Sequence, residues 1–166
     1  AGGGEAEDSC SLVVYSNDYT GFSDGCGNTG MATVTFTATD ACGNSTDTTA
    51  IVTLVDSTAP NLLVPAQDTI VECDGAGNMA DLNAWLDAYA NVLFEDACSE
   101  PLDYDSLLIE TTPGCGMTIS YTYAFFATDA CDNVSEQSIA TFTVIDETSP
   151  TVVAGMDLTV ECDGTG

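Results

Sequence analysis

An all-β fold of two tandem units is predicted by an internal repeat and by hydrophobic residues that alternate along several segments. Phe36–Asn44 returns as Phe125–Asn133, at an offset of 89 residues in a chain of 166. Val71–Gly75 returns as Val160–Gly164 at the same offset. Each unit is therefore about 90 residues long, the size of an immunoglobulin-like antiparallel β-sandwich.

The alternating segments are the expected strands of these sandwiches. Thr33–Ala38 and Ile119–Ala124 alternate with a period of two, as do Ile51–Val55 and Thr141–Ile145. This period places successive side chains on opposite faces of a sheet, so that the apolar face is buried and the threonine-rich face is solvated.

One segment, near residues 81–93, predicts a short helix that only the second unit contains. Its apolar residues recur at helical spacing, and Asp81 is placed to cap the start of the helix. We expect this stripe to cover one end of the sandwich, with Trp85 in the core rather than in a binding site. The stripe consists of Leu82, Trp85, Leu86, Tyr89 and Leu93.

The repeat divides the chain into three parts. Residues 1–58 form a first immunoglobulin-like unit, and residues 59–149 form a second, complete one. Residues 150–166 carry a further copy of the Val-Glu-Cys strand, which the first unit lacks. We expect this C-terminal strand to be donated to a following unit or to another copy of the chain.

The charge of the chain excludes several functions. It has 27 acidic residues and no lysine, arginine or histidine. Phosphate recognition requires positive side chains, so nucleic acid and anionic lipid are excluded as partners. We expect no enzyme, because only chemistry that uses a pair of carboxylates survives this composition. No apolar run approaches the ~20 residues of a membrane span, so membrane insertion is not expected.

Three motifs carry a family resemblance: T-F-T-A-T-D-A-C-G-N at residues 35–44, V-D-S-T-A-P at 55–60 and V-E-C-D-G at 71–75. They resemble the tandem HYR and related immunoglobulin-like repeats of large secreted proteins of Bacteroidota. Those proteins are typically exported by the type IX system and end in a gliding-motility-associated sorting domain. The resemblance implies a secreted protein, extracellular or at the cell surface.

Eight cysteines without any histidine predict disulfides rather than zinc or iron–sulfur ligation. An oxidising compartment follows from this interpretation. Antiparallel strands bring the start of one strand beside the end of another, which predicts two bonds, and elimination predicts the others. The expected pairs are Cys10–Cys42, Cys98–Cys131, Cys73–Cys115 and, between two copies of the chain, Cys26–Cys162.

The strand missing from the first unit and the extra strand at the C-terminus are complementary. An open sandwich exposes an apolar groove and unpaired strand edges, which a donated strand would cover. Met156, Leu158 and Val160 are the expected donor residues, with Leu158 and Val160 pointing inward. The alternative is that a preceding repeat of a longer array supplies the same strand.

These features predict a structural subunit of an extracellular filament or pilus-like fibre, assembled head-to-tail by strand donation and reinforced by disulfides. Copies of the chain itself are then its partners, and no cofactor is required. The alternative is an adhesive stalk or ligand-binding repeat of a long cell-surface protein, with a carbohydrate or a host protein as its ligand.

Covalent glycans are expected at serine, threonine and asparagine residues. Asp followed by Ser or Thr resembles the O-glycosylation pattern of Bacteroidota, and Asn44 and Asn133 begin N-glycosylation sequons at equivalent repeat positions. A turn role is the alternative for these asparagines. The candidate O-linked positions are Thr48, Ser57, Thr69 and Ser106.

Calcium is the metal that the acidic composition favours, because clustered carboxylates bind it through oxygen. Asp56 and Asp146 stand at unit boundaries, where acidic groups could join neighbouring modules. Asp40 and Asp129 precede cysteines at strand ends, and ending the strand is their alternative role. These four residues are the candidate ligands.

Overall fold

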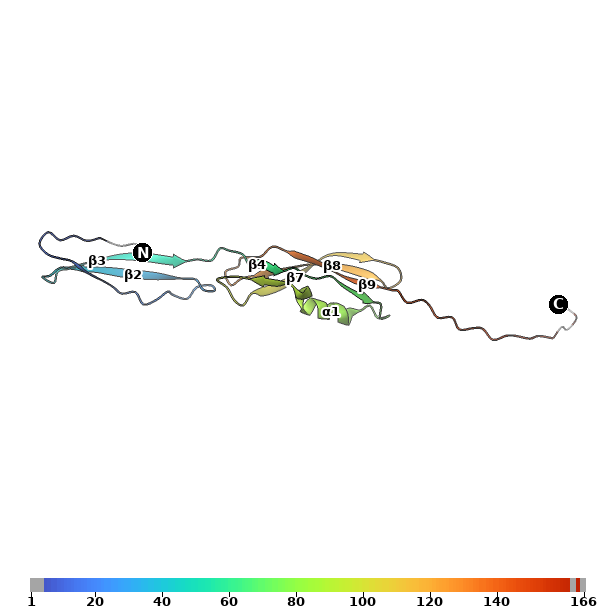
Figure 1. Cartoon of the computed structure of the whole chain (residues 1–166). Helices are drawn as coiled ribbons and strands as arrows, with labels where there is room; N and C mark the ends of the chain where they lie inside the picture. Colours follow the sequence, from blue (N-terminus) through green and yellow to red (C-terminus); the bar gives the residue numbers. More distant parts are fainter. Residues whose placement is uncertain (1–4, 162–163, 165–166) are drawn as a thin grey trace.

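The structure, a computed structural model, describes residues 5–161 and Gly164. Its regular structure is almost entirely β, with a single short helical region, which confirms the predicted fold class. The two units lie end to end, and the residues after 149 extend away from the second unit (Figure 1). No helix in the described part of the chain has the length and apolarity that crossing a membrane requires.

The first unit is one antiparallel sheet of three strands in the order β1-β2-β3. These strands are β1 (Val14–Asn17), β2 (Gly30–Thr39) and β3 (Ser45–Leu54). The β2–β3 turn is fixed by a carboxylate, because Asp40 Oδ1 accepts the backbone N–H groups of Cys42 and Asn44 at 2.9 and 2.8 Å. Gly43 completes this turn with a φ of 88°, which favours glycine.

The second unit has two sheets and the helical region. The larger sheet has the order β5-β9-β8-β7, in which β5 runs parallel to β9 and the other pairs are antiparallel. The smaller sheet pairs β4 with β6. The elements are β4 (Asn61–Val64), β5 (Thr69–Glu72), α1 (Met79–Asp87), the 3-10 helix η1 (Tyr89–Asn91), β6 (Leu93–Glu95), β7 (Asp103–Pro113), β8 (Ile119–Thr128) and β9 (Ser138–Ile145).

The helix differs from the prediction in its cap and its extent. Its N-cap is Asn78, whose φ of 52° is left-handed, and Asp81 lies in the first turn, where it accepts a hydrogen bond from Asn78 Nδ2 at 3.0 Å. Asp81 is therefore not the cap, because the turn from Asp74 to Asn78 sets the helix start. Positive φ angles at residues 89–91 end the helical region, and Leu93 begins β6 instead.

The helix covers the larger sheet and completes the core of the second unit. Trp85 is only 6% exposed, and its ring centroid lies 5.3 Å from that of Phe125 and 5.7 Å from that of Phe142. Its indole N–H donates to the carbonyl oxygen of Gln67 at 3.0 Å, so the polar end of the ring is also satisfied. Trp85 is a core residue, as predicted.

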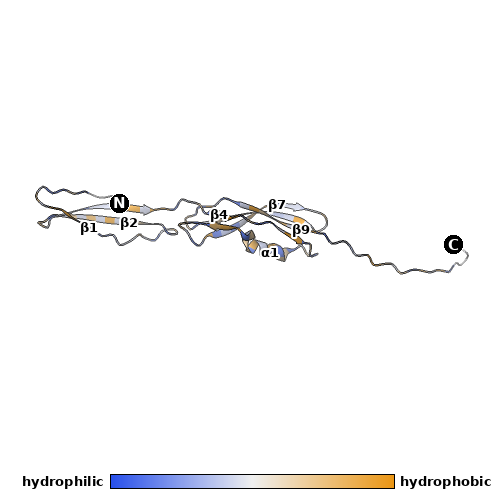
Figure 2. Ribbon diagram, viewed as in Figure 1, coloured by the Kyte–Doolittle hydropathy of each residue, from blue (hydrophilic) through white to orange (hydrophobic). Residues whose placement is uncertain are grey.

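The corresponding hairpins of the two units share one register but differ in burial. Gly30 pairs with Leu54 in β2–β3, as Ile119 pairs with Val144 in β8–β9. Val144 is 1% exposed, whereas Leu54 is 47% exposed and every residue of β3 is exposed. Hydrophobic stretches lie on strands of both units (Figure 2). In the described residues, no helix or second sheet covers those of the first unit.

This contrast predicts that truncating the equivalent residues Phe36 and Phe125 changes the free energy of unfolding by very different amounts. Phe125→Ala should lower the free energy of unfolding of the second unit by about 3–5 kcal/mol, because it removes a fully buried ring from the core. Urea unfolding followed by the fluorescence of Trp85, the single tryptophan, measures this value. The matched control is Phe36→Ala, which should leave this transition in place. Equal shifts for both variants would contradict the assignment.

Candidate functional site

The free edge of β3 is the most distinctive feature of the first unit. In the second unit, β9 is flanked by β8 on one side and by β5 on the other. In the first unit, β3 is flanked by β2 alone within the described residues. Because the repeat aligns β1, β2 and β3 with β7, β8 and β9, the vacant position beside β3 is the one that β5 fills in the second unit.

A pair of tyrosines supports this alignment independently. The hydroxyl of Tyr15 accepts from the N–H of Ala6 at 3.0 Å and donates to its carbonyl oxygen at 2.9 Å. Tyr104 makes the same two contacts with Phe94 of β6, at 3.0 and 3.4 Å. The segment around Ala6 is therefore the counterpart of β6. The described residues of the first unit provide counterparts of β6 to β9 but none of β4, β5 and α1.

A hollow of about 190 Å³ lies on the uncovered side of the first unit. It is bounded by Ala6, Tyr15 and Phe36, and by residues 46–48 of β3. Phe36 is only half-buried there, whereas its repeat counterpart Phe125 is sealed under Trp85. The hollow thus marks where the covering layer of the second unit has no equivalent in the first.

The residues after the second unit, 150–161, are called the donor tail here. They contain no strand or helix. The three residues predicted for donation are all uncovered: Met156 is 97% exposed, Leu158 85% and Val160 75%. An extended apolar segment in water is unfavourable, since about 25 cal/mol is gained for each Å² of apolar surface that is buried.

A disulfide between Cys26 and Cys131 joins the two units, with the Cα atoms 5.1 Å apart and a sequence separation of 105. The loop that carries Cys26 packs against the second unit, where the N–H of Asn28 donates to the carbonyl oxygen of Cys98 at 2.8 Å. A side chain at Gly27 would lie 2.7 Å from that same oxygen, so the close approach requires glycine.

This bond corrects two predictions. Cys98–Cys131 is wrong, because Cys131 is bonded to Cys26 and Cys98 is a free thiol. The intermolecular role of Cys26 is also wrong, since its partner lies in the same chain. Strand geometry within one unit could not reveal a loop of the other unit docking beside Cys131. Cys162, the other half of the predicted intermolecular bridge, lies outside the described residues.

The two remaining predicted bonds are not formed. Cys10 and Cys42 are exposed free thiols, although the hydroxyl of Ser11 accepts from the N–H of Ala41 at 3.3 Å and so holds their segments together. Cys73 and Cys115 are also free. Cys73 follows β5 and Cys115 lies in the β7–β8 turn, and β9 separates β5 from β8, which leaves about 10 Å of sheet between them. Disulfide formation needs Cα atoms within about 7 Å.

Three carboxylates gather at the junction of the units. Oxygens of Asp56, Asp96 and Asp129 lie within 4.8 Å of one another. Two of the four predicted calcium ligands, Asp56 and Asp129, are thus brought together, whereas Asp40 and Asp146 are not part of this cluster. Asp96 was missed, although residues 95–98 (Glu-Asp-Ala-Cys) repeat residues 7–10 (Glu-Asp-Ser-Cys).

Protein donors already occupy this cluster. Asp96 Oδ1 accepts the N–H groups of Cys98 and Ser99, and the Ser99 hydroxyl donates to Asp56 at 3.2 Å. Asp129 accepts the N–H of Cys131 at 2.8 Å and the side-chain amide of Asn133 at 2.8 Å. Three carboxylates are suitable ligands for a hard divalent cation. The hydrogen bonds alone, however, satisfy the cluster.

Hydrogen bonding also sets the titration of Asp129, which is only 5% exposed. Burial raises the pKa of this carboxyl, but the hydrogen bonds from Asn133 and Cys131 outweigh it, so the pKa lies below its ordinary value of 3.8. Asp40 occupies the same turn of the first unit, and hydrogen bonds from Asn44 likewise lower its pKa. Asn44 and Asn133 therefore stabilise turns, which is the role predicted as the alternative to glycosylation.

The candidate glycosylation positions differ in access. Asn44, Thr48 and Ser57 are exposed. Thr69, Ser106 and Asn133 are only partly exposed. The side-chain nitrogen of Asn44 donates to Asp40 at 2.7 Å, as that of Asn133 does to Asp129, so both sequon nitrogens are engaged in turns. Glycosylation of these residues remains a prediction.

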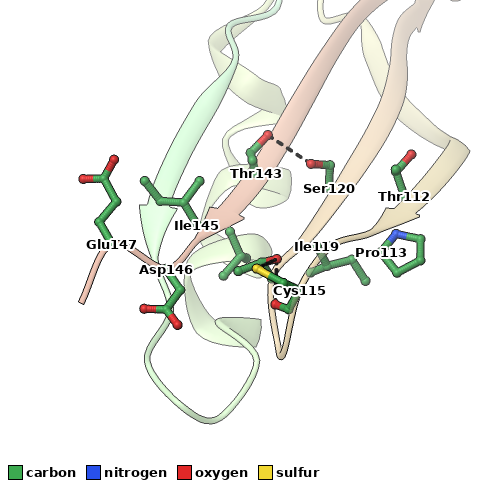
Figure 3. Close-up of a pocket in the computed structure, with 12 residues that line it drawn as sticks. Thr112, Pro113, Cys115, Ile119, Ser120, Thr143, Ile145, Asp146 and Glu147 are labelled. Atoms are coloured by element: carbon green, nitrogen blue, oxygen red, sulfur yellow. Dashed lines mark hydrogen bonds between the residues drawn. The ribbon is translucent and has the colours of Figure 1, made fainter. Parts of the chain in front are cut away.

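A hollow of about 430 Å³ lies at the far end of the second unit, where the chain leaves β9. Figure 3 shows Ile145, Asp146 and Glu147 at this point, near the β7–β8 turn that carries Cys115.

Comparison with models of known protein families and with curated proteins finds no match to the chain.

The inter-unit disulfide predicts the outcome of peptide mapping. The chain has no lysine or arginine for trypsin, so peptic digestion after alkylation without reduction is the suitable method. Mass spectrometry should find Cys26 linked to Cys131 and Cys98 alkylated. A linked peptide that contains Cys98 and Cys131 would contradict the structure and favour the pairing within one unit.

The hydrogen bonds of Asp129 predict a pH-dependent contribution to stability. Since its pKa is lower in the folded chain than in the unfolded chain, the contribution is present above pH 3.8 and is lost as the pH falls through the folded value. Asp129→Asn should therefore destabilise the second unit at about pH 6 and less at about pH 2.5. Urea unfolding at both pH values measures this, and an equal loss at both would contradict it.

Proposed function

We propose that this chain is a structural subunit of an extracellular filament or pilus-like fibre, assembled head-to-tail. The donor tail of one copy adds to the open first unit of the next and supplies its missing strand. The observation that carries this proposal is the free, uncovered edge of β3 together with an exposed tail whose sequence repeats β5.

Burial of apolar surface supplies the driving force. Leu158 and Val160 are 85% and 75% exposed, and Val52 and Leu54 of β3 are 51% and 47% exposed. Each large aliphatic side chain contributes about 1.5–3 kcal/mol when it is fully buried. Backbone hydrogen bonds along the edge of β3 add to this and give the contact its direction.

Disulfide reinforcement is proposed within each subunit. A subunit that bears load must transmit it from its first unit to its second. The Cys26–Cys131 bond links the two units beside the connecting segment at residues 55–60. A disulfide of this kind contributes about 2–4 kcal/mol in typical proteins. Disulfides are also typical of secreted proteins, which supports an extracellular location.

Net charge is the main opposing term. With a formal charge of −27 on each chain and no basic residue, neighbouring subunits repel one another. Salt screens this repulsion and reduces its range to a Debye length of about 8 Å at 0.15 M. Assembly is therefore expected to increase with ionic strength.

Concentration-dependent polymers of the purified chain are the expected result. Light scattering and negative-stain electron microscopy should detect rods that lengthen with protein concentration and with salt. A synthetic peptide of residues 151–164 should block elongation, because it occupies the first unit. The control peptide carries Leu158→Asp and Val160→Asp and should not block it.

A chain that stays monomeric at every concentration and salt level would overturn the filament proposal. Binding of that monomer to a carbohydrate array would then support the adhesive alternative.

A further inference from the structure

The second unit shows how its fourth strand is held in register. β5 runs parallel to β9, with Ile70 opposite Thr143 and Val71 opposite Val144. Hydrophobic alternation alone permits a slip of two residues, because such a slip returns the same side chains to the same face. Something besides apolar packing must therefore select the register.

Two carboxylates on β5 and just before it supply that selection. Asp68 Oδ1 accepts the backbone N–H of Thr141 at 2.8 Å, on the side of β9 that faces β5. The carboxylate of Glu72 accepts the N–H of Glu147 at 3.0 and 3.1 Å and the hydroxyl of Thr148 at 2.7 Å. These groups contact β9 at one end and the turn after it at the other, so only one register satisfies both.

The donor tail carries the same pair at the same spacing. Asp157 and Glu161 lie 89 residues after Asp68 and Glu72, and Val160 lies 89 residues after Val71. Both tail carboxylates belong to a segment that is exposed throughout. They are free to accept hydrogen bonds from another molecule.

The first unit presents the matching donors. Thr33 pairs with Ile51 in β2–β3, as Thr122 pairs with Thr141 in β8–β9. Because the two hairpins share this register, the N–H of Ile51 points toward the vacant edge as that of Thr141 points toward β5.

The turn after β3 is also preformed. The N–H of Thr58 donates to Asp56 Oδ1 at 3.1 Å, and the N–H of Thr148 donates to Asp146 Oδ1 at the same distance. The equivalent donors to a glutamate are then the N–H of Ser57 and the hydroxyl of Thr58. Both residues are exposed.

A donor tail that fills this edge belongs to a second copy of the chain, because the tail cannot reach its own first unit. Residues 146–157 span about 40 Å when fully extended. The 11-residue strand β7 alone makes the second unit about 36 Å long. The path would then have to continue along residues 55–60 before it entered β3. Figure 1 shows the tail leaving on the opposite side.

We propose that Asp157 and Glu161 fix the register of the donated strand, which lies parallel to β3 of a second copy. Asp157 accepts the N–H of Ile51, and Glu161 accepts the N–H of Ser57 and the hydroxyl of Thr58. Leu158 then lies opposite Val52, and Val160 lies opposite Leu54. This inference rests on the proposed function and specifies its partner surface.

Calorimetric titration of the full chain with a peptide of residues 151–164 tests the register. Glu161→Gln in the peptide should weaken binding about 10-fold or more, since hydrogen bonds to a charged group are lost. Thr58→Val in the chain should weaken binding of the unchanged peptide and remove much of the effect of Glu161→Gln. The control peptide, Thr159→Val, should bind as the unchanged one does, because its counterpart Ile70 faces outward at 66% exposed.

The outcomes separate this inference from the filament proposal. If the unchanged peptide binds and Glu161→Gln and Asp157→Asn bind equally well, the register inference is wrong, while strand donation stands. If the unchanged peptide does not bind and the chain does not polymerise, both fail. Glu161 lies in the exposed tail, so the same substitution in the full chain should raise the concentration needed for polymerisation about 10-fold without changing the melting temperature.

Discussion

Each unit contains three consecutive antiparallel strands, β1-β2-β3 or β7-β8-β9, and the need to cover their apolar face governs the structure of both units. An antiparallel sheet buries one face, and that face needs a second layer. The second unit solves this within its own sequence, through Trp85 and the two-stranded sheet that packs over Phe125 and Phe142. The first unit has the same hairpin in the same register but leaves β3 exposed along its whole length. The second unit therefore shows which covering elements the first unit requires.

A second constraint is the absence of any basic side chain. With 27 acidic groups, no carboxylate can pair with lysine, arginine or histidine in its own chain. Backbone N–H groups and amides take that place, as at Asp40, Asp129 and Glu72. Charge-assisted hydrogen bonds of this kind are about twice as strong as neutral ones. Acidic residues thus act as local organisers of turns and strand ends rather than only as solubilising charge.

Much of this fold could be predicted from sequence because it depends on local periodicity and on the repeat. The strand hairpins, the helical stripe and the core position of Trp85 follow from such patterns. The disulfide partners could not be predicted, because Cys26 meets Cys131 only after the two units dock. Asp96 was missed for the same reason, since its neighbours Asp56 and Asp129 belong to distant segments. The helix start depended on a turn at Asn78 that has no periodic signal.

Register is the property that a repeat can encode and that hydrophobicity cannot. Leu158 and Val160 would face the first unit equally well after a shift of two residues in either direction. A pair of carboxylates tolerates no such shift, because a displacement of about 7 Å would move Glu161 away from the turn donors at Ser57 and Thr58 even where Asp157 met another N–H group of the edge. A negatively charged chain gains further from this arrangement, since each contact places a charge against backbone and hydroxyl donors instead of against other carboxylates. In the donated strand, the carboxylates of Asp157 and Glu161 therefore select the register, and the apolar side chains of Leu158 and Val160 between them stabilise the contact.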